Sequence, residues 1–208
     1  MSGNESGIQR AMSALIRNNM TAYFVENRRE LPPLLDTLIP QGALVGVGDS
    51  VTLQETGVLE MLRGGRCRFL DKHKEGLTGE EKRRIYLQNF SADVFMCSAN
   101  ALTEDGEIYN IDGNGSRVAP LLYGPAQVIL VVGGNKIVTN LDEARRRARQ
   151  YAAPLDAGRL GKNTPCARTG ICTDCNSPDR ICNSFVVVRR QFVKDRIKVV
   201  IVNEILGY

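Results

Sequence analysis

Two hydrophobic patterns alternate along the chain. Apolar residues spaced three and four positions apart predict helices, and short continuous apolar runs between them predict buried strands. The predicted helices cover approximately residues 8–20, 34–39, 52–62, 78–88 and 140–152. The predicted strands are 21–25, 43–47, 67–70, 94–97, 107–112, 127–132, 185–188 and 198–202. This alternation is typical of an α/β fold with a mainly parallel sheet and helices on both faces.

Local signals mark where several elements begin or turn. Thr78 and Glu81 have the spacing of a capping box, which predicts the start of the helix that ends near residue 88. Asn140 precedes the arginine-rich helix, whose first turn carries the acidic residues that the helix dipole favours. Asp105 and Gly106, between two strand-like runs, predict a hairpin.

Size and composition favour a soluble globular protein. The 208 residues are 43% hydrophobic and 24% charged, and no apolar run approaches the ~18 residues that a membrane span needs. We interpret 1–208 as a single domain with a cysteine-rich insert at about 163–183. The polar start lacks the order of a secretory signal, and Cys67 and Cys97 lie in apolar stretches, so a cytoplasmic location is expected.

The net charge of +4 is weak evidence for any anionic partner. The one basic run, residues 145–147 with Arg149, lies on a predicted helix whose other face carries Leu141, Ala144 and Ala148. We therefore interpret these arginines as a solvated helix face. Neither nucleic-acid binding nor membrane association is expected.

Polar residues gather where predicted strands end, the place where open α/β sheets bind ligands. After the run 43–47, a glycine turn opens a helix, and the candidate anion-binding residues there are Gly46, Gly48, Asp49, Ser50 and Thr52. The spacing matches neither the dinucleotide fingerprint nor a P-loop, so a tight turn without a ligand is an equal alternative. Glu55, one turn into the helix, is a candidate general base or nucleophile, with a surface carboxylate as the alternative.

A second polar constellation lies between residues 98 and 115. Its candidate ligand-binding residues are Asn100, Thr103 and Asn110, and Asp112 is a candidate catalytic residue. Turn chemistry explains part of this composition, but the polar density is larger than turns need. Lys136 follows the strongest predicted strand and is a candidate anion ligand, with a solvated loop lysine as the alternative.

Four of the six cysteines fall within 17 residues, in a stretch without helical or strand periodicity. They are Cys166, Cys172, Cys175 and Cys182. Structural zinc usually takes two close cysteine pairs, whereas this array has one, and iron–sulfur binding tolerates such spacings better. A [4Fe-4S] cluster is therefore expected first, with zinc (Zn), redox-active disulfides and unliganded thiols as alternatives. The only histidine, His73, lies in a charged loop and is expected to be exposed to solvent.

The number of ligating cysteines decides what such a cluster does. Three ligands leave one iron open as a Lewis acid, whereas four make the cluster structural or electron-transferring. Arg168 and Arg180, inside the array, would offset the thiolate charge or bind a substrate carboxylate, with exposed loop arginines as the alternative.

Three long motifs together carry a family resemblance. Residues 46–57, 98–117 and 123–138 resemble the LUD (lactate utilisation) domain family, which includes lactate-utilisation protein C. The resemblance spans nearly the whole chain. It implies the fold shared by ribose-5-phosphate isomerase, glucosamine-6-phosphate deaminase and CoA transferases, with a ligand cleft over the glycine turn. The cysteine stretch resembles a subset of the family with extra cysteines and departs from the shorter lactate-utilisation protein C type.

These observations together lead to a functional expectation. The chain is expected to bind a small carboxylate or phosphorylated metabolite beside a [4Fe-4S] cluster, in lactate or hydroxy-acid metabolism. Glu55 or Asp112 would move a proton, and the cluster or Lys136 would hold the anion. One alternative is a non-catalytic subunit that docks onto iron–sulfur or flavin oxidoreductase subunits. The family resemblance implies this alternative, because several partners of lactate-utilisation proteins are iron–sulfur proteins. Another is a zinc-stapled binding domain. Pairing of sheet edges into a homo-oligomer is a further expectation.

Overall fold

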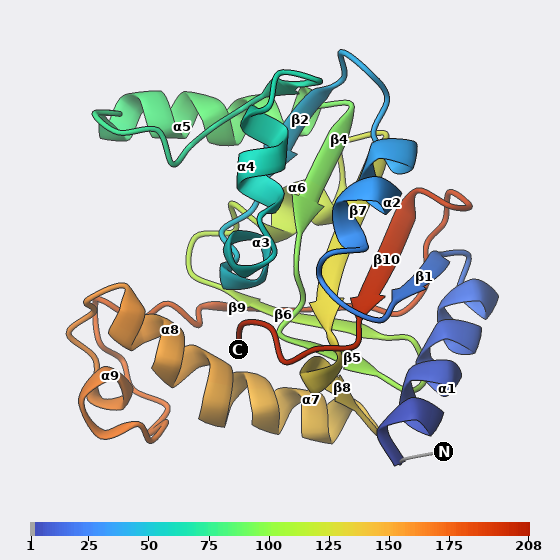
Figure 1. Cartoon of the computed structure of the whole chain (residues 1–208). Coiled ribbons are helices and arrows are strands. Elements are labelled where there is room, and N and C mark those ends of the chain that lie inside the picture. The colour runs from blue at the N-terminus through green and yellow to red at the C-terminus, as the bar shows by residue number, and fades with distance from the viewer. Residues whose placement is uncertain (1–2) are drawn as a thin grey trace.

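The structure is a computed structural model that describes residues 3–208, with side chains from residue 5 onward. Its largest feature is a six-stranded sheet in which all neighbouring strands are parallel (Figure 1). The order across the sheet is β1 (Thr21–Val25), β10 (Ile197–Val202), β7 (Gln127–Gly133), β4 (Val94–Cys97), β2 (Leu44–Val47) and β3 (Arg68–Phe69). The α/β fold with a mainly parallel sheet that the sequence predicts is confirmed.

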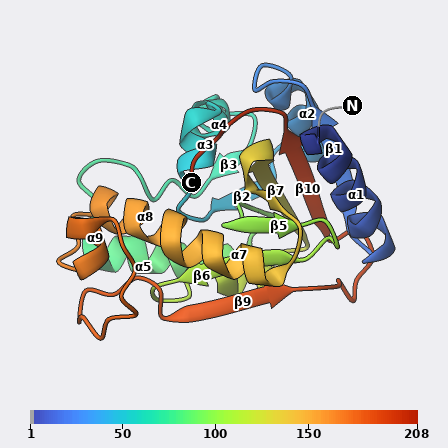
Figure 2. The same cartoon turned by 90° about the horizontal axis from the view of Figure 1, so that it is seen from below.

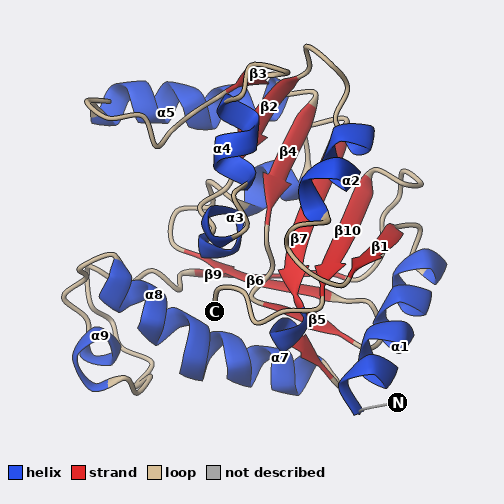
Figure 3. Cartoon of the chain, viewed as in Figure 1, coloured by secondary structure: helices blue, strands red, loops and turns tan. Residues whose placement is uncertain are grey.

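Different layers cover the two faces of this sheet. Helices α2 (Leu31–Leu38), α3 (Val51–Glu55) and α4 (Val58–Arg63) pack on one face (Figure 3). Helices α1 (Gly3–Arg17) and α6 (Val118–Leu122) pack on the other, together with part of a second sheet. The continuous Val, Ile and Leu runs of β7 and β10 are buried because both faces are covered.

The second sheet has the order β8 (Ile137–Val138), β5 (Ala101–Thr103), β6 (Ile108–Asp112) and β9 (Ser184–Val188). Strands β5 and β6 form the hairpin predicted at Asp105 and Gly106, and Gly106 has a φ of +75°, which a residue with a side chain rarely adopts. The sequence patterns at 107–112 and 185–188 predict strands correctly but do not reveal that the two pair antiparallel outside the main sheet.

The helix predicted over 52–62 is wrong as a single element. Gly57, with a φ of +70°, interrupts it and separates α3 from α4. By contrast, the capping box of Thr78 and Glu81 is present at the start of α5 (Gly79–Gln88). Helix α5 buries none of its residues and projects from the body of the protein (Figure 1).

The arginine-rich helix is longer than predicted. It begins at the Asn140 cap as α7 (Leu141–Arg147), passes through a π-helical turn (Ala148–Ala152) and continues as α8 (Ala153–Arg159). Pro154 lies two residues after the π-helical turn, an irregularity in the helix that accommodates a residue without an N–H to donate. This long helix runs across the second sheet (Figure 2), where Tyr109 and Ile111 of β6 pack against Ala144 and Ala148.

The cysteine segment, residues 163–183, connects α8 to β9, the position predicted for the insert. It contains one short helix that the sequence pattern does not predict, α9 (Pro165–Thr169), which begins at the Thr164 cap. Short 3-10 turns cover Asn89–Ser91 and Gly134–Lys136. Among residues 3–208, every helix is too short or too polar to cross a membrane.

Candidate functional site

A cavity of about 400 Å³ opens where strands of both sheets end. Its walls come from the segments after β2 (residues 49–52) and β4 (residues 98–100), from the end of β6 and the loop after it, and from α8. Residues 178–181 of the cysteine segment close another side. Strand ends therefore form the cleft, as the α/β pattern predicts, and the cysteine segment lies beside it.

Lys136 is the most buried charged side chain of the cavity, with 3% of its surface exposed. Its Nζ donates hydrogen bonds to Thr52 Oγ1 at 2.8 Å and Ser98 Oγ at 3.1 Å. In the described part of the chain no carboxylate forms an ion pair with it. Burial, together with the charges of Arg147 and Arg117, lowers the pKa of Lys136 to about 7, and the charge of Glu55 acts in the opposite direction.

The main chain of residues 206–208 fixes the surroundings of Lys136. Leu206 N donates to Asn135 Oδ1, and Asn135 Nδ2 donates to the carbonyl of Gly207. A Cβ at position 207 would lie 2.6 Å from Thr52 Oγ1 and 3.3 Å from Lys136 Nζ, so only glycine fits. Sequence analysis missed this segment because nothing in its composition indicates that it folds back over the strand ends.

A second lysine, Lys72, is 7% exposed and lies 5.5 Å from the centre of the Tyr86 ring. It too is without an ion pair among the described residues. Burial lowers the pKa of Lys72 to about 8, with Asp49 opposing that shift and Arg117 adding to it. Lys72 is not among the predicted site residues, although its place two residues after the predicted strand 67–70 is a usable signal.

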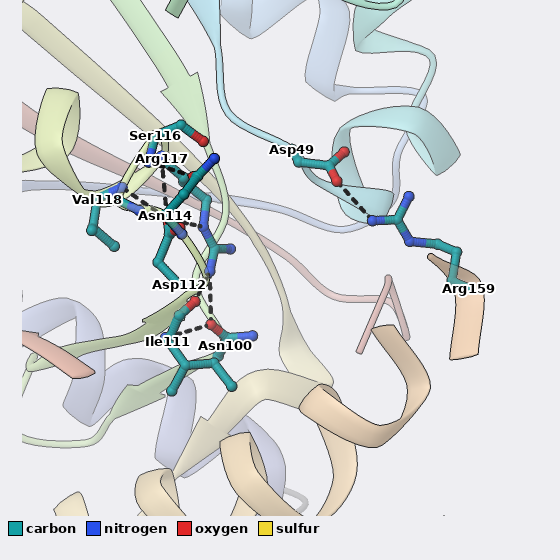
Figure 4. Close-up of polar contacts among 10 residues, drawn as sticks. Asp49, Asn100, Ile111, Asp112, Asn114, Ser116, Arg117, Val118 and Arg159 are labelled. Carbon is teal, nitrogen blue, oxygen red and sulfur yellow. Dashed lines mark hydrogen bonds and ion pairs between the residues drawn. The ribbon is translucent and has the colours of Figure 1, made fainter. Parts of the chain in front are cut away.

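The loop after β6 is organised by Asp112, whose carboxylate accepts hydrogen bonds from the backbone N–H groups of four residues (Figure 4). These are Asn114, Gly115, Arg117 and Val118. Arg117 in turn donates to Asn100 Oδ1 at 2.9 Å and to the Ile111 carbonyl at 2.6 Å. The Arg117 Nε also lies 4.0 Å from Asp112 Oδ2. Asn100 and Asp112 thus both line the cavity and hold the Arg117 guanidinium in it.

Asp49 is paired across the cavity with Arg159 of α8, from Arg159 Nη2 to Asp49 Oδ2 at 2.7 Å (Figure 4). Burial acts to raise the pKa of Asp49, but the charges of Lys72 and Arg159 outweigh it and hold the pKa below its usual value. The negative charge of Asp49, which would oppose an anionic ligand, is therefore neutralised by a neighbouring cation.

The glycine turn has a different role from the one predicted. A Cβ at Gly46 would lie 2.1 Å from Asn89 Oδ1, and one at Gly48 would lie 2.8 Å from Arg117 Cγ. Gly48 N donates to the Met96 carbonyl, so this N–H is occupied within the sheet. Both glycines allow close packing under the cavity, whereas Asp49, Ser50 and Thr52 line it.

Three other predicted site residues lie outside the cavity lining. Glu55 is exposed, and its Oε2 accepts a hydrogen bond from Gly207 N at 2.6 Å. Thr103 is buried in the hairpin, where it bonds to Glu107. Asn110 is fully buried within β6, and neither atom of its side-chain amide finds a hydrogen-bond partner among the described residues.

Two expectations about charged residues are wrong. His73 is half-buried rather than exposed, and burial lowers the pKa of the imidazole, with the charge of the neighbouring Lys72 acting in the same direction. The arginine run is only partly solvated, since Arg147 donates to the carbonyls of Asn100 and Asn135, and Arg149 forms an ion pair with Asp174. The two arginines therefore connect the helix to the strand ends and to the cysteine segment.

All six cysteines are free thiols. Cys172 Sγ accepts from Arg149 Nη2 at 3.9 Å, and Cys166 Sγ contacts Thr164 Oγ1 at 3.3 Å. Burial raises the pKa of the Cys182 thiol, and Arg180 opposes that shift. The Cys172 and Cys166 thiols add to the shift, so Cys166, Cys172 and Cys182 lie in one electrostatic neighbourhood, close enough for their charges to interact.

The donor set of four thiols suits an iron–sulfur cluster chemically. Among residues 3–208, no group of three or more His, Cys, Asp or Glu side chains is placed to hold a metal ion.

Comparison with known proteins is consistent with this architecture. The family model of the LUD domain matches residues 8–202. The chain belongs to the LUD domain family. This LUD protein shares its fold with a DUF162 family protein from Deinococcus radiodurans, with a TM-score of 0.54 and 13% sequence identity over 97% of this chain and 99% of that chain. No curated protein matches the sequence.

Proposed function

We propose that this LUD protein binds a small carboxylate or phosphorylated metabolite in its cavity and exchanges a proton with it through Lys136. The observation that carries the proposal is that Lys136 and Lys72, both nearly buried, face one cavity without forming an ion pair within the described chain. A buried cation without a partner is unfavourable, and an anionic ligand would supply the missing charge.

The two carboxylates whose charges act on Lys72, those of Asp49 and Asp112, are both engaged by other groups. Asp49 is paired with Arg159, and the Asp112 carboxylate is occupied by backbone N–H groups. Arg117 lies close enough to both lysines that its charge lowers both pKa values. The three cations therefore form one positive region, and a cavity of about 400 Å³ suits a small metabolite.

Proton exchange is assigned to Lys136 rather than to Glu55 or Asp112. Glu55 bonds to the main chain of Gly207, and Asp112 holds its loop. A lysine whose pKa lies near 7 exists in both protonation states at neutral pH, as a general acid or base requires.

Calorimetric titration with lactate, pyruvate, ribose 5-phosphate and inorganic phosphate tests this proposal. At least one of these anions should bind, and Lys72→Met should weaken that binding about tenfold or more. Lys74→Met is the matched control, because Lys74 is exposed and lies outside the cavity lining. Failure of all four anions to bind, or equal effects of the two variants, would contradict the proposal.

We also propose a [4Fe-4S] cluster on the cysteine segment, with zinc as the alternative. Support comes from the four-thiol donor set, from the electrostatic neighbourhood of Cys166, Cys172 and Cys182, and from Arg149 and Arg180 beside them. Anaerobic reconstitution with iron and sulfide, followed by iron and sulfide analysis and visible spectroscopy, tests the cluster. Zinc in the natively purified protein would support the alternative, and co-purifying iron–sulfur or flavin proteins would support a subunit role.

A further inference from the structure

The Lys136 amine is held in one position by groups that can carry protons. Thr52 Oγ1 and Ser98 Oγ both bond to its Nζ, and the two hydroxyls lie 3.4 Å from each other. The main chain at Gly207 packs against the same atoms. A flexible lysine side chain is therefore fixed at the cavity wall, with two hydroxyl groups in contact with its nitrogen.

We propose that Lys136 forms an imine with a 2-oxo acid whose carboxylate is bound by Lys72 and Arg117. This inference rests on the proposed function and names the substrate class of the same site. It follows from the different contacts of the three cations that line the cavity. The Lys136 amine bonds to two hydroxyls, Lys72 lies beside the Tyr86 ring, and Arg117 bonds to Asn100 and to the Ile111 carbonyl. A 2-oxo acid presents the matching pair of groups, a carbonyl carbon next to a carboxylate.

The step is balanced without an oxidant or a metal. The unprotonated Nζ adds to the carbonyl carbon, a C–N bond forms, and a proton passes from nitrogen to oxygen to give a carbinolamine. The C–O bond then breaks, and the oxygen leaves as water after taking up a proton. The Thr52 and Ser98 hydroxyls are the groups in contact with Nζ, and they pass these protons.

The burial of Lys136 distinguishes a nucleophile from a simple anion clamp. A lysine that only attracts anions works best when it stays charged, as exposed lysines do. Lys136 is instead desolvated and forms no ion pair with a carboxylate of the described chain, the environment in which lysines become nucleophilic. Its pKa of about 7 supports this geometry, because a large share of the amine is then unprotonated at neutral pH.

Reductive trapping tests the inference. The full-length protein is incubated with pyruvate and sodium cyanoborohydride, and intact mass is measured with time. One adduct should appear, heavier by one pyruvic acid less one oxygen atom. Tryptic mapping should place it on Lys136, where the modified side chain blocks cleavage before Ile137.

Variants separate this adduct from nonspecific labelling. The labelling rate should fall about tenfold in Lys72→Met, because the carboxylate loses one of its cations, and should not change in Lys74→Met. An adduct spread over exposed lysines, or a labelling rate that is equal in both variants, would overturn the imine.

Titration with pyruvate distinguishes failure of the imine from failure of anion binding. Binding of pyruvate without an adduct at Lys136 under reducing conditions would overturn the imine and leave the proposed function intact. Absence of binding by every anion tested would remove both.

Discussion

Arg159 joins helix α8 to the turn after β2 through its 2.7 Å hydrogen bond to Asp49. The pair is partly exposed, with 30% and 40% of the two side chains accessible. Its contribution to stability is therefore small, at most about 1 kcal/mol. Its larger effect is electrostatic, because it neutralises a carboxylate beside Lys72.

Arg159→Leu should consequently weaken anion binding more than it weakens the fold. We expect the dissociation constant of the bound anion to rise about threefold to tenfold, since the Asp49 charge is then unopposed by the guanidinium. Titration calorimetry and urea unfolding measure the two effects. Arg146→Leu removes a comparable exposed pair with Glu143 on α7 and should leave binding unchanged. Similar binding losses in both variants would contradict the assignment.

The stability of the protein should depend on pH through Lys136. The pKa of Lys136 is about 7 in the folded state, against 10.5 for a solvated lysine such as that of the unfolded chain. Below about pH 7 the lysine is therefore charged in both states, and burying its charge destabilises the folded state to the full extent. Between about pH 7 and pH 10.5 the unfolded state binds more protons than the folded state. The free energy of unfolding of the wild type, relative to Lys136→Met, should therefore rise with pH by up to a few kcal/mol.

Urea unfolding of both proteins from about pH 6 to pH 10 measures this difference. Lys72 titrates in the same range but is present in both proteins, so its contribution cancels to first order. The groups whose charges act on Lys136 are Arg147, Arg117 and Glu55, and none of them is changed. Parallel pH profiles for the two proteins would show that Lys136 is not desolvated in the folded state.

Gly207→Ala should be more destabilising than its backbone conformation alone explains. The φ of +55° disfavours alanine, and the added Cβ would lie 2.6 Å from Thr52 Oγ1. We expect a loss of about 2–3 kcal/mol, against about 1 kcal/mol for Gly42→Ala. Gly42 is the matched control because its φ is +74° and a Cβ there would meet no atom within 4 Å. Equal losses in thermal or urea unfolding would mean that residues 206–208 do not pack on Thr52.

Asp112→Ala should unfold the loop after β6 or strongly destabilise it. Four backbone N–H groups lose their acceptor, and we expect a loss of about 3 kcal/mol in the free energy of unfolding. Asp93→Ala is the control, since the Asp93 carboxylate accepts from the single backbone N–H of Leu44. Its loss should be about 1 kcal/mol. A smaller effect for Asp112 than for Asp93 would contradict the loop-organising role.

Thiol labelling of the metal-free protein should separate the cysteines by environment. Cys97 is fully buried, and burial raises its pKa to about 12, so it should stay unreactive until the protein unfolds. Cys172, half-buried beside Arg149, should react much faster. Mass spectrometry of alkylated peptides over time measures both rates. Protection of Cys166, Cys172 and Cys182 after reconstitution with iron and sulfide would identify them as ligands.

The sequence patterns predict the layers better than the site. The Val and Ile runs of β7 and β10 and the polar residues Asn100 and Asp112 at strand ends follow from periodicity. The burial of Lys72 and the position of the main chain near Gly207 depend on tertiary packing between segments far apart in sequence. For Lys72 the local pattern gives only its place after a predicted strand, and for Gly207 it gives no signal. Thr103 and Asn110 look like site residues because they are polar, yet they lie deeper in the second sheet.

The position of residues 178–181 has a thermodynamic consequence. This stretch forms part of the cavity wall and is bounded by Cys175 and Cys182. Any oxidation or metal loading that repositions those two cysteines also reshapes the wall that a ligand contacts. Ligand binding and the chemistry of the thiols would then be linked equilibria, and such linkage is reciprocal. If a metal binds the thiols and changes the affinity of the cavity for its ligand, the ligand changes the affinity of the thiols for that metal by the same factor.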